Sequence, residues 1–347
     1  MIRISVIYLF VLTSFFVAGQ DNSIDTLPYR SFKEKIVWFG DLGYASAPFS
    51  IRYPFNDSIS KLKYRNNIRT VLGFGMSYKW FSLRLAVSLP GYLKSPSRYG
   101  RTDQFNLNVD FTIKKVFYDI DIKHLRGYSI VDAFHWNDTL NELNPNDVRR
   151  DQVSSMFSIN AWYFNNPDFK MSALRGRTGN YRSKVQTWYI RSIFSAFNIE
   201  NQDADFVVVP SSLALTDHKT SSDQYFGLDL GVVPGIAYVD RKGDWQFGGN
   251  VGAGLALQFK QYKINSIPKG ISGIAPRYDI RLMGGYNVDN TFLMLITDFD
   301  NKSLRFTDLK IRQTYYSIRL AFGTRITPKP KQKDKSKKKK NDQALTI

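Results

Sequence analysis

The sequence contains no cysteine, only three histidines and, after its first twenty residues, no long apolar run. The absence of cysteine excludes disulfides, cysteine metal sites, thiol catalysis and a lipid-modified cysteine at a signal cleavage point. A membrane-spanning helix needs about 20 consecutive apolar residues, so we expect none in the mature chain. The function therefore has to be sought in other features.

The first twenty residues have the pattern of an export signal. Arg3 supplies the positive charge at the start, residues 4–18 form the apolar run, and Ala18, Gly19 and Gln20 form the small-residue exit. A spanning helix is the alternative, but an apolar run of about 15 residues is short for one. We therefore expect a signal peptide at 1–20, cleaved near Gly19/Gln20, followed by a periplasmic N-terminal segment at 21–33.

The stretch QFNLNVDFTIK at 104–114 alternates apolar and polar side chains without a fault. This period of two is typical of a strand with one apolar and one polar face. Similar but weaker patterns at 34–44, 186–198 and 291–299 have apolar residues on both faces. The remaining predicted strands are 72–80, 81–89, 118–123, 157–163, 226–238, 245–260, 277–287 and 315–322.

The apolar faces of these strands are together larger than one soluble core would bury. Aromatic residues make up 15% of the chain, with 20 Tyr, 26 Phe and 6 Trp, which suits the interface girdles of a membrane barrel. A soluble periplasmic β-domain is the alternative. The sequence predicts an all-β fold: a transmembrane antiparallel β-barrel of about 12 strands, of the outer-membrane type, at 34–326.

The lengths of the connections give an independent indication, because outer-membrane barrels combine short periplasmic turns with long outer loops. Short connections are expected at 79–80, 114–115, 240–243 and 288–290, and long ones at 45–67, 90–103, 125–153, 199–224 and 262–275. The two kinds alternate. The span 165–185 breaks this rule, and we interpret it as an extra strand or a segment folded into the lumen.

Several segments together resemble a known family. The signal end at Gly19 to Asp21, the hairpin FNLNVDFTIKKVFYDIDIKHLRGYSI at 105–130 and the strand at 154–163 are similar to a Bacteroidota family of uncharacterised outer-membrane β-barrels, a domain of unknown function. The resemblance covers most of the mature chain. It implies a barrel fold and a location in the outer membrane of a Gram-negative bacterium, and it implies no activity or functional residue.

Charged residues on the predicted inner faces are the candidate site. One interpretation is that they pair across the lumen and close it. The other is that they line a narrow pathway for a small polar solute, whose selectivity they set. These lumen-facing candidates are Arg84, Asp110, Asp119, Asp121, Asp229, Asp279, Arg281 and Arg319.

An enzyme would need a nucleophile and a base. His124, His135 and His218 all fall at or beyond the outer ends of predicted strands, and His124 could pair with Ser129 as in a lipid-modifying barrel enzyme. A separation of five residues fixes no geometry, so we expect no catalytic activity. No two histidines have ligand spacing, and we expect neither a metal site nor a cofactor.

The formal charge of +18 is concentrated in part at the C-terminus, where residues 327–347 carry eight lysines against two aspartates. We expect a disordered periplasmic tail. An exported protein does not meet nucleic acid, so an anionic envelope polymer is the better candidate partner for the tail. The other expected partners are outer-membrane lipid and the barrel-assembly machinery.

The sequence thus predicts an outer-membrane barrel of structural or small-solute transport type. The alternatives are a lipid-modifying barrel enzyme and a surface adhesion or partner-docking barrel that acts through loops such as 125–153.

Overall fold

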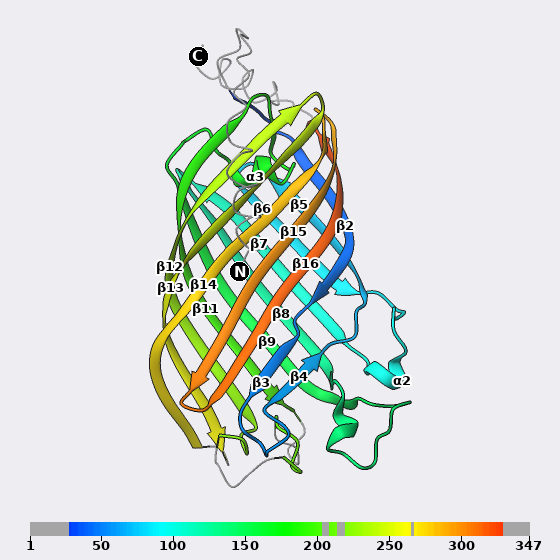
Figure 1. Cartoon of the computed structure of the whole chain (residues 1–347). Helices are drawn as coiled ribbons and strands as arrows, with labels where there is room; N and C mark the ends of the chain where they lie inside the picture. The colour runs from blue at the N-terminus through cyan, green and yellow to red at the C-terminus, as the bar shows by residue number, and fades with distance from the viewer. Residues whose placement is uncertain (1–27, 203–207, 214–218, 265–266, 329–347) are drawn as a thin grey trace, which may run out of the picture.

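The computed structural model describes residues 28–202, 208–213, 219–264 and 267–328. Within these residues, twelve antiparallel strands form a closed ring, in which β16 pairs with β2 (Figure 1). The predicted barrel of about 12 strands is therefore confirmed. The strands of the ring are β2 (Ile36–Ser46), β5 (Thr70–Tyr78), β6 (Phe81–Ser88), β7 (Asp103–Ile113), β8 (Val116–Ile130), β9 (Asp147–Phe164), β11 (Val185–Asn201), β12 (Gln224–Lys242), β13 (Trp245–Ile264), β14 (Ile267–Asn287), β15 (Thr291–Phe306) and β16 (Leu309–Ile326).

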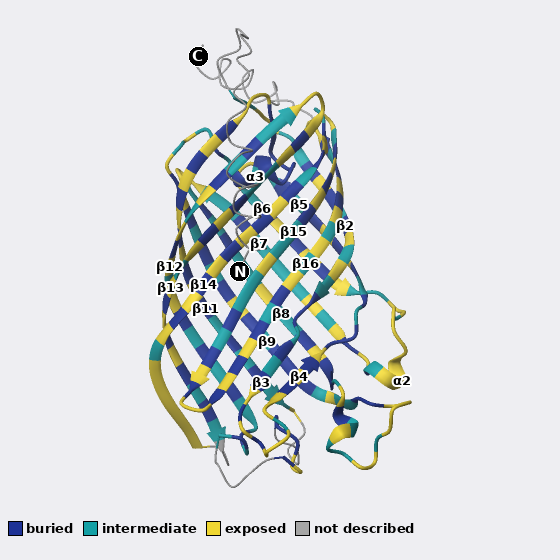
Figure 2. Ribbon diagram, viewed as in Figure 1, coloured by how far each residue is buried: buried dark blue, intermediate teal, exposed yellow. Residues whose placement is uncertain are grey.

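The side chains of each strand alternate between the inside and the outer surface of the ring, and Figure 2 shows this as alternating buried and exposed residues. In β7, Asp110 is 2% exposed on the inside while Ile113 is 51% exposed on the outside. The outer surface is largely apolar, with exposed side chains such as Trp38, Leu42, Phe74, Leu85, Leu230, Leu255 and Phe322. An apolar surface of this extent suits contact with lipid. None of the described helices is both long enough and apolar enough to pass through a bilayer.

The two ends of the ring differ. Short turns join β5 to β6, β7 to β8, β12 to β13 and β14 to β15 at one end, which we call the turn end. Long connections gather at the opposite end, which we call the loop end. One of them carries α2 (Pro96–Tyr99), and another carries the short 3-10 helix η1 (Ala133–His135). The predicted signal peptide at 1–20 and almost all of the predicted tail at 327–347 lie outside the described residues.

The predicted long loop at 45–67 is wrong in part, because it contains β3 (Phe49–Arg52) and β4 (Lys61–Arg65). β3 pairs with β16, and β4 pairs with β3 and with the end of β8. This hairpin therefore takes the place of the short strands β5, β6 and β7 in the wall at the loop end. The strands are only four and five residues long, too short for a clear periodic signal.

The predicted long loop at 262–275 is also wrong. β13 and β14 continue through it as a hairpin, from Lys263 opposite Pro268 to Ala256 opposite Ala275. β14 pairs with β15 only from Ile280 toward the turn end, so, among the described residues, 267–279 have no strand partner on that side. Pro and Gly are tolerated on an edge strand, and the segment therefore looked like a loop in the sequence.

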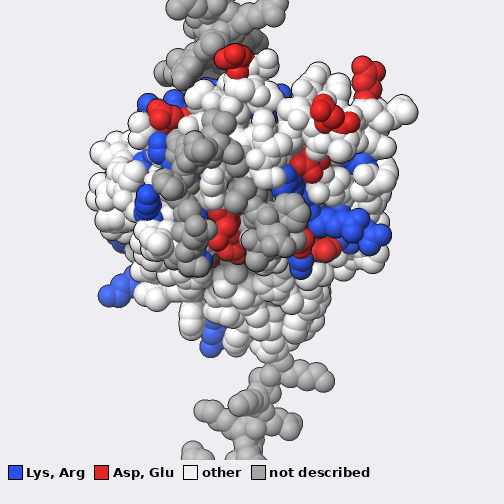
Figure 3. Space-filling model, turned by 90° about the horizontal axis from the view of Figure 1, so that it is seen from below, with Lys and Arg blue, Asp and Glu red and all other residues white. Residues whose placement is uncertain are grey.

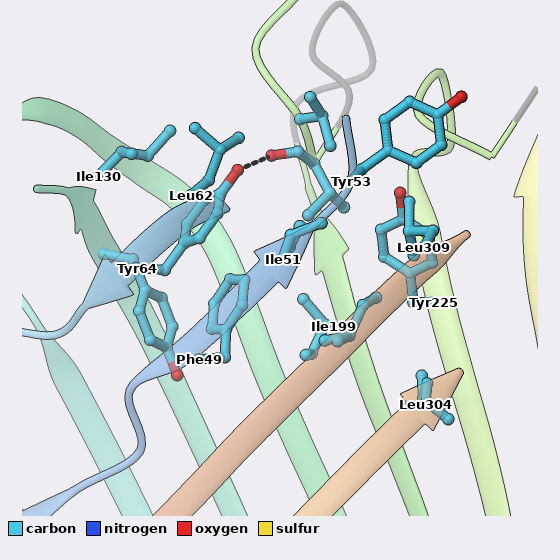
Figure 4. Close-up of a cluster of buried hydrophobic side chains, with 14 of the residues drawn as sticks. Phe49, Ile51, Tyr53, Leu62, Tyr64, Ile130, Ile199, Tyr225, Leu304 and Leu309 are labelled. Carbon is cyan, nitrogen blue, oxygen red and sulfur yellow. Dashed lines mark hydrogen bonds between the residues drawn. The ribbon is translucent and has the colours of Figure 1, made fainter. Parts of the chain in front are cut away.

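A cluster of buried apolar side chains fills the barrel at the loop end; we call it the cap (Figure 4). Its rings pack closely: Phe49 stacks on Tyr64 with 4.2 Å between ring centroids. The Tyr64 hydroxyl donates to the carbonyl oxygen of Val208 at 2.7 Å. Cap side chains on the ring strands and the β3–β4 hairpin include Phe49, Ile51, Tyr64, Leu125, Tyr128, Met156, Ile199, Tyr225, Leu304, Phe306 and Tyr315.

Residues 165–184, between β9 and β11, fold into the barrel at the turn end, and we call them the plug. The plug contains the single turn α3 (Met171–Leu174) and β10 (Gly179–Tyr181), which pairs with β1 (Tyr29–Ser31). Figure 1 shows α3 inside the ring. Both features expected for the span 165–185, a short extra strand and a segment within the lumen, are present.

Candidate functional site

Two aspartates on neighbouring strands attach the plug to the wall. Asp110 of β7 lies directly opposite Asp119 of β8, an arrangement that is unfavourable without a cation between them. Arg175 supplies it: its Nη1 is 2.9 Å from Asp110 Oδ2, and its Nη2 is 2.8 Å from Asp119 Oδ2. Arg177 donates from Nη1 to the same Asp110 oxygen at 2.5 Å and to Ser82 Oγ at 2.7 Å. The plug thus neutralises an acidic pair in the wall.

Arg175 and Arg177 both remain charged at neutral pH. Burial lowers the pKa of Arg177 to about 10, and the attraction of Asp110 opposes this shift. Burial also lowers the pKa of Arg175, but the attraction of Asp110 and Asp119 outweighs it and leaves that pKa raised. Charged guanidiniums buried beside carboxylates are held firmly, because separation would leave charges without partners.

Polar wall residues also satisfy the backbone of the plug. Arg325 of β16 donates to the carbonyl oxygens of Gly176 and, at 3.1 Å, Arg177. Gln246 of β13 donates to the carbonyl of Ala173 at 3.0 Å and accepts from the amide of Tyr181 at 3.0 Å. Aromatic side chains pack around these contacts: Phe39, Phe117, Trp162, Phe164, Phe169, Tyr189 and Phe292. The turn end is therefore closed by polar and apolar contacts together.

A cavity of about 110 Å³ with many charged residues in its lining lies between the plug and the cap; we call it the chamber. At about 10–15 Å³ per water, it has room for a small cluster of water molecules or a small solute. Arg175 bounds it on the plug side and Leu125, Met156 and Tyr315 on the cap side. Its charged lining consists of Asp41, Arg84, Asp119, Asp121, Lys123, Arg175, Arg191, Arg281, Asp298, Asp300 and Arg319.

The charges of the chamber are paired with one another. Arg84 binds Asp41 through two hydrogen bonds of 2.6 Å. On the neighbouring strands β15 and β16, Arg319 lies 3.0 Å from Asp298. The side chains of Lys123 and its partner Asp121, 2.6 Å apart, keep exposures of 27% and 15%. Side chains of both signs therefore remain partly accessible within the chamber, where they can meet a solute.

The structure brings five of the eight predicted lumen residues together in the chamber: Arg84, Asp119, Asp121, Arg281 and Arg319. The other three also point into the barrel but lie outside the chamber lining. Asp110 holds the plug. Asp229 pairs with Arg277 at 2.5 Å. Asp279 pairs with Arg191 at 3.2 Å and accepts a hydrogen bond from Trp162 Nε1 at 2.9 Å.

Several chamber residues were not among the predicted candidates. Lys123 has the same strand parity as Asp119 and Asp121, so the alternation in β8 could have identified it. Asp298 and Asp300 alternate in the same way in β15. Arg175 had no such signal, because the irregular plug carries no period. The residues that the prediction missed are Asp41, Lys123, Arg175, Arg191, Asp298 and Asp300.

The predicted histidines lie apart from the chamber. His124 Nδ1 is 3.0 Å from Ser155 Oγ, its cross-strand neighbour on β9, whereas Ser129 donates to the backbone oxygen of Arg65 at 3.4 Å. His124 has the parity of the exposed Ile122, so it faces outward. His218 lies outside the described residues. In the described part of the chain, no group of three or more His, Asp or Glu residues is arranged to hold a metal ion.

Comparisons with known proteins give a family and a set of barrels. The model of the family described as Domain of unknown function (DUF4421) matches residues 23–326. No curated protein matches the chain. The chain is similar to the outer membrane protease OmpT from Escherichia coli, with 10% identity, coverage of 88% of this chain and 100% of that chain, and a TM-score of 0.38. It is also similar to the translocator domain of the autotransporter NalP from Neisseria meningitidis, with 8% identity, coverage of 93% of this chain and 95% of that chain, and a TM-score of 0.36. An outer membrane channel from Pseudomonas putida F1 has 10% identity, coverage of 88% of this chain and 100% of that chain, and a TM-score of 0.35.

Proposed function

The chain belongs to the DUF4421 family, a domain of unknown function, and we propose that it is an outer-membrane barrel that handles a small polar solute in a closed central chamber. The apolar outer surface of the ring and the export-signal pattern support the location. An even number of strands places both ends of the barrel domain on one side. Short turns are typical of the periplasmic side, so the turn end and its plug face the periplasm.

The chamber is the main observation that supports the handling of a small polar solute. It is a cavity lined by charges of both signs, of which Lys123 and Asp121 keep partial exposure, and it lies between the plug and the cap. Such charges can bind the polar groups of a small solute. Because the plug fills the turn end and the cap fills the loop end, we infer that the barrel is closed at rest and that the plug is the periplasmic gate.

The same geometry favours a role without catalysis. The outward-facing pair His124 and Ser155 resembles the nucleophile and base of a lipid-modifying enzyme. Such a pair also needs a group that orients the histidine, and no described carboxylate forms a hydrogen bond or ion pair with His124. We therefore keep solute handling as the proposal.

Labelling of a single cysteine tests the gate, because the natural chain has none. Ser317→Cys places a thiol at the chamber, next to Asp298. In vesicles, we expect slow reaction with a membrane-impermeant thiol reagent and no steady conductance. Adding Asp110→Asn and Asp119→Asn leaves the plug arginines without counter-charges. Labelling from the turn end should then accelerate about tenfold or more, a factor that corresponds to about 1.4 kcal/mol.

The matched control is Asp229→Asn, which breaks an equally buried ion pair without touching the plug. It should leave the labelling rate unchanged. A steady conductance of the wild-type protein would show an open pore and contradict the closed chamber. If Asp110→Asn with Asp119→Asn is labelled no faster than the Asp229→Asn control, the plug is not a gate, and the barrel is purely structural.

A further inference from the structure

Four cationic side chains form a row across four adjacent strands at the loop end. Arg305 of β15 lies directly opposite Lys310 of β16, Lys310 opposite Arg52 of β3, and Arg52 opposite Lys61 of β4. We call these four residues the cationic row. All four are exposed on the outer surface of the wall. Neighbouring strands lie about 4.8 Å apart, so the row spans roughly 14 Å.

Three further cations extend the row into a patch. Arg312 and Lys63 lie one pleat nearer the turn end, on either side of Ser50. Arg65 follows on β4, and all three are exposed. Among the described residues, none of these seven cations forms an ion pair. Like charges directly opposite one another on a sheet destabilise it, so an anion bound across the patch would relieve this repulsion.

The patch directly continues the apolar belt. Along the outer face of β16, exposed Phe322, Leu320, Ile318 and Tyr316 are followed by Thr314, Arg312 and Lys310. Exposed Tyr316, Phe299 opposite it on β15 and Tyr44 on β2 form an aromatic group of the kind found at a membrane interface, and we call them the girdle residues. Four residues separate Tyr316 from Arg312, about 13 Å along the strand and roughly 10 Å along the membrane normal at the tilt of a barrel strand. The cations therefore lie at the depth of lipid headgroups.

We propose that this patch binds the phosphate groups of a phosphorylated lipid in the leaflet at the loop end. Arginine and lysine are the usual partners of phosphate, and a basic patch adjoining an apolar surface attracts anionic lipid through charge and acyl chains together. Figure 3 looks onto this end and shows Lys and Arg side chains projecting from its rim. The inference rests on the proposed membrane location and orientation but not on solute handling.

The apolar belt beside the patch also favours a lipid over other anionic ligands. Inorganic phosphate or a soluble acidic polymer would use only the charges, whereas the patch is continuous with the exposed girdle residues Tyr316, Phe299 and Tyr44. A lipid engages both surfaces at once. Because at least two rows of the sheet carry cations, a headgroup with more than one phosphate can bind across them.

The test is native mass spectrometry of the full-length protein in detergent, titrated with phosphorylated lipid A and with the same lipid after enzymatic removal of its phosphates. We expect the phosphorylated form to bind at least about tenfold more tightly, since each cation near an anionic surface contributes substantially to attraction. Replacing the cationic row by Arg52→Gln, Lys61→Gln, Arg305→Gln and Lys310→Gln should abolish this preference. Replacing the same residues with the other cation, as in Arg52→Lys and Lys61→Arg, should keep it.

A matched control removes four exposed lysines near the turn end: Lys33→Gln, Lys115→Gln, Lys184→Gln and Lys242→Gln. It has the same change of net charge and should bind the phosphorylated lipid as the wild type does. Circular dichroism checks that each variant forms the barrel. Equal binding of the two lipid forms, or equal losses in the row and control variants, would overturn the proposal. Complete competition by millimolar inorganic phosphate would show a simple anion site and overturn the lipid assignment.

Discussion

The plug and the cap both close the barrel, but they do so with different parts of the chain. The plug is a separate segment that enters the lumen between β9 and β11, and Arg175 and Arg177 fasten it to wall carboxylates. The cap is built from the ends of the wall strands and the β3–β4 hairpin, and its contacts are mainly apolar, such as the stacking of Phe49 on Tyr64. The plug is inserted into the lumen, whereas the cap is part of the wall.

This difference indicates which of the two closures can move without unfolding the barrel. The cap cannot open without separating strands that continue into the barrel wall, so its stability is that of the barrel. The plug can leave while the twelve-stranded ring stays intact, because its main polar contacts are side-chain contacts to the wall and its pairing is with β1. We therefore propose that the moving gate is the plug at the turn end.

The largest expected effect comes from Arg175→Met. It leaves Asp110 and Asp119 buried opposite each other, and of the two plug arginines that bind them only Arg177 remains, on Asp110. The free energy of unfolding in urea should fall by about 3–5 kcal/mol, the usual result of removing one partner of a buried ion pair. In an Asp110→Asn and Asp119→Asn background the same substitution should cost much less. Equal losses in the two backgrounds would contradict the coupling.

A cap substitution should destabilise the barrel without opening the plug. Leu304 of β15 is 1% exposed within the cap. Leu304→Ala should lower the free energy of unfolding by about 2–5 kcal/mol through lost burial and a residual cavity. The labelling rate of Ser317→Cys from the turn end should stay at the wild-type value. Faster labelling, comparable to that expected for Asp110→Asn with Asp119→Asn, would show that the two closures are not independent.

The sequence predicted the ring because its strands report their environment through period two. The strand at 104–114 alternates cleanly, since its outer face meets lipid and its inner face meets the polar chamber. The strands at 34–44, 186–198 and 291–299 gave weaker patterns for a reason that the structure explains. Their inner faces carry Phe39, Tyr189 and Phe292, which pack around the plug. Apolar residues on both faces therefore mark the wall that surrounds a packed segment.

The partners of the inward-facing charges could not be predicted, because they depend on contacts across the lumen. The parity of β7 and β8 placed Asp110 and Asp119 on the inside, but nothing in their spacing identified Arg175 as the partner.

The predicted strand that corresponds to β8 ended too early, at residue 123. Its period breaks at a bulge at Gly127, where φ is +93° and a Cβ atom would lie 1.8 Å from the carbonyl oxygen of Arg101. Only glycine fits there, and the strand continues beyond it to Ile130.

The smallest effect is expected at the rim of the plug. Arg30 of β1 pairs with Asp289 in the turn before β15, and their side chains are 50% and 46% exposed. Asp289→Asn should lower the free energy of unfolding by less than about 1 kcal/mol, because water screens an exposed pair. The difference should vanish in about 1 M salt, where the Debye length is about 3 Å. Urea unfolding of the wild type and Asp289→Asn at low and high salt measures this difference in free energy of unfolding. A loss as large as that of Arg175→Met would mean that the exposed rim pair, rather than the buried arginines, fastens the plug.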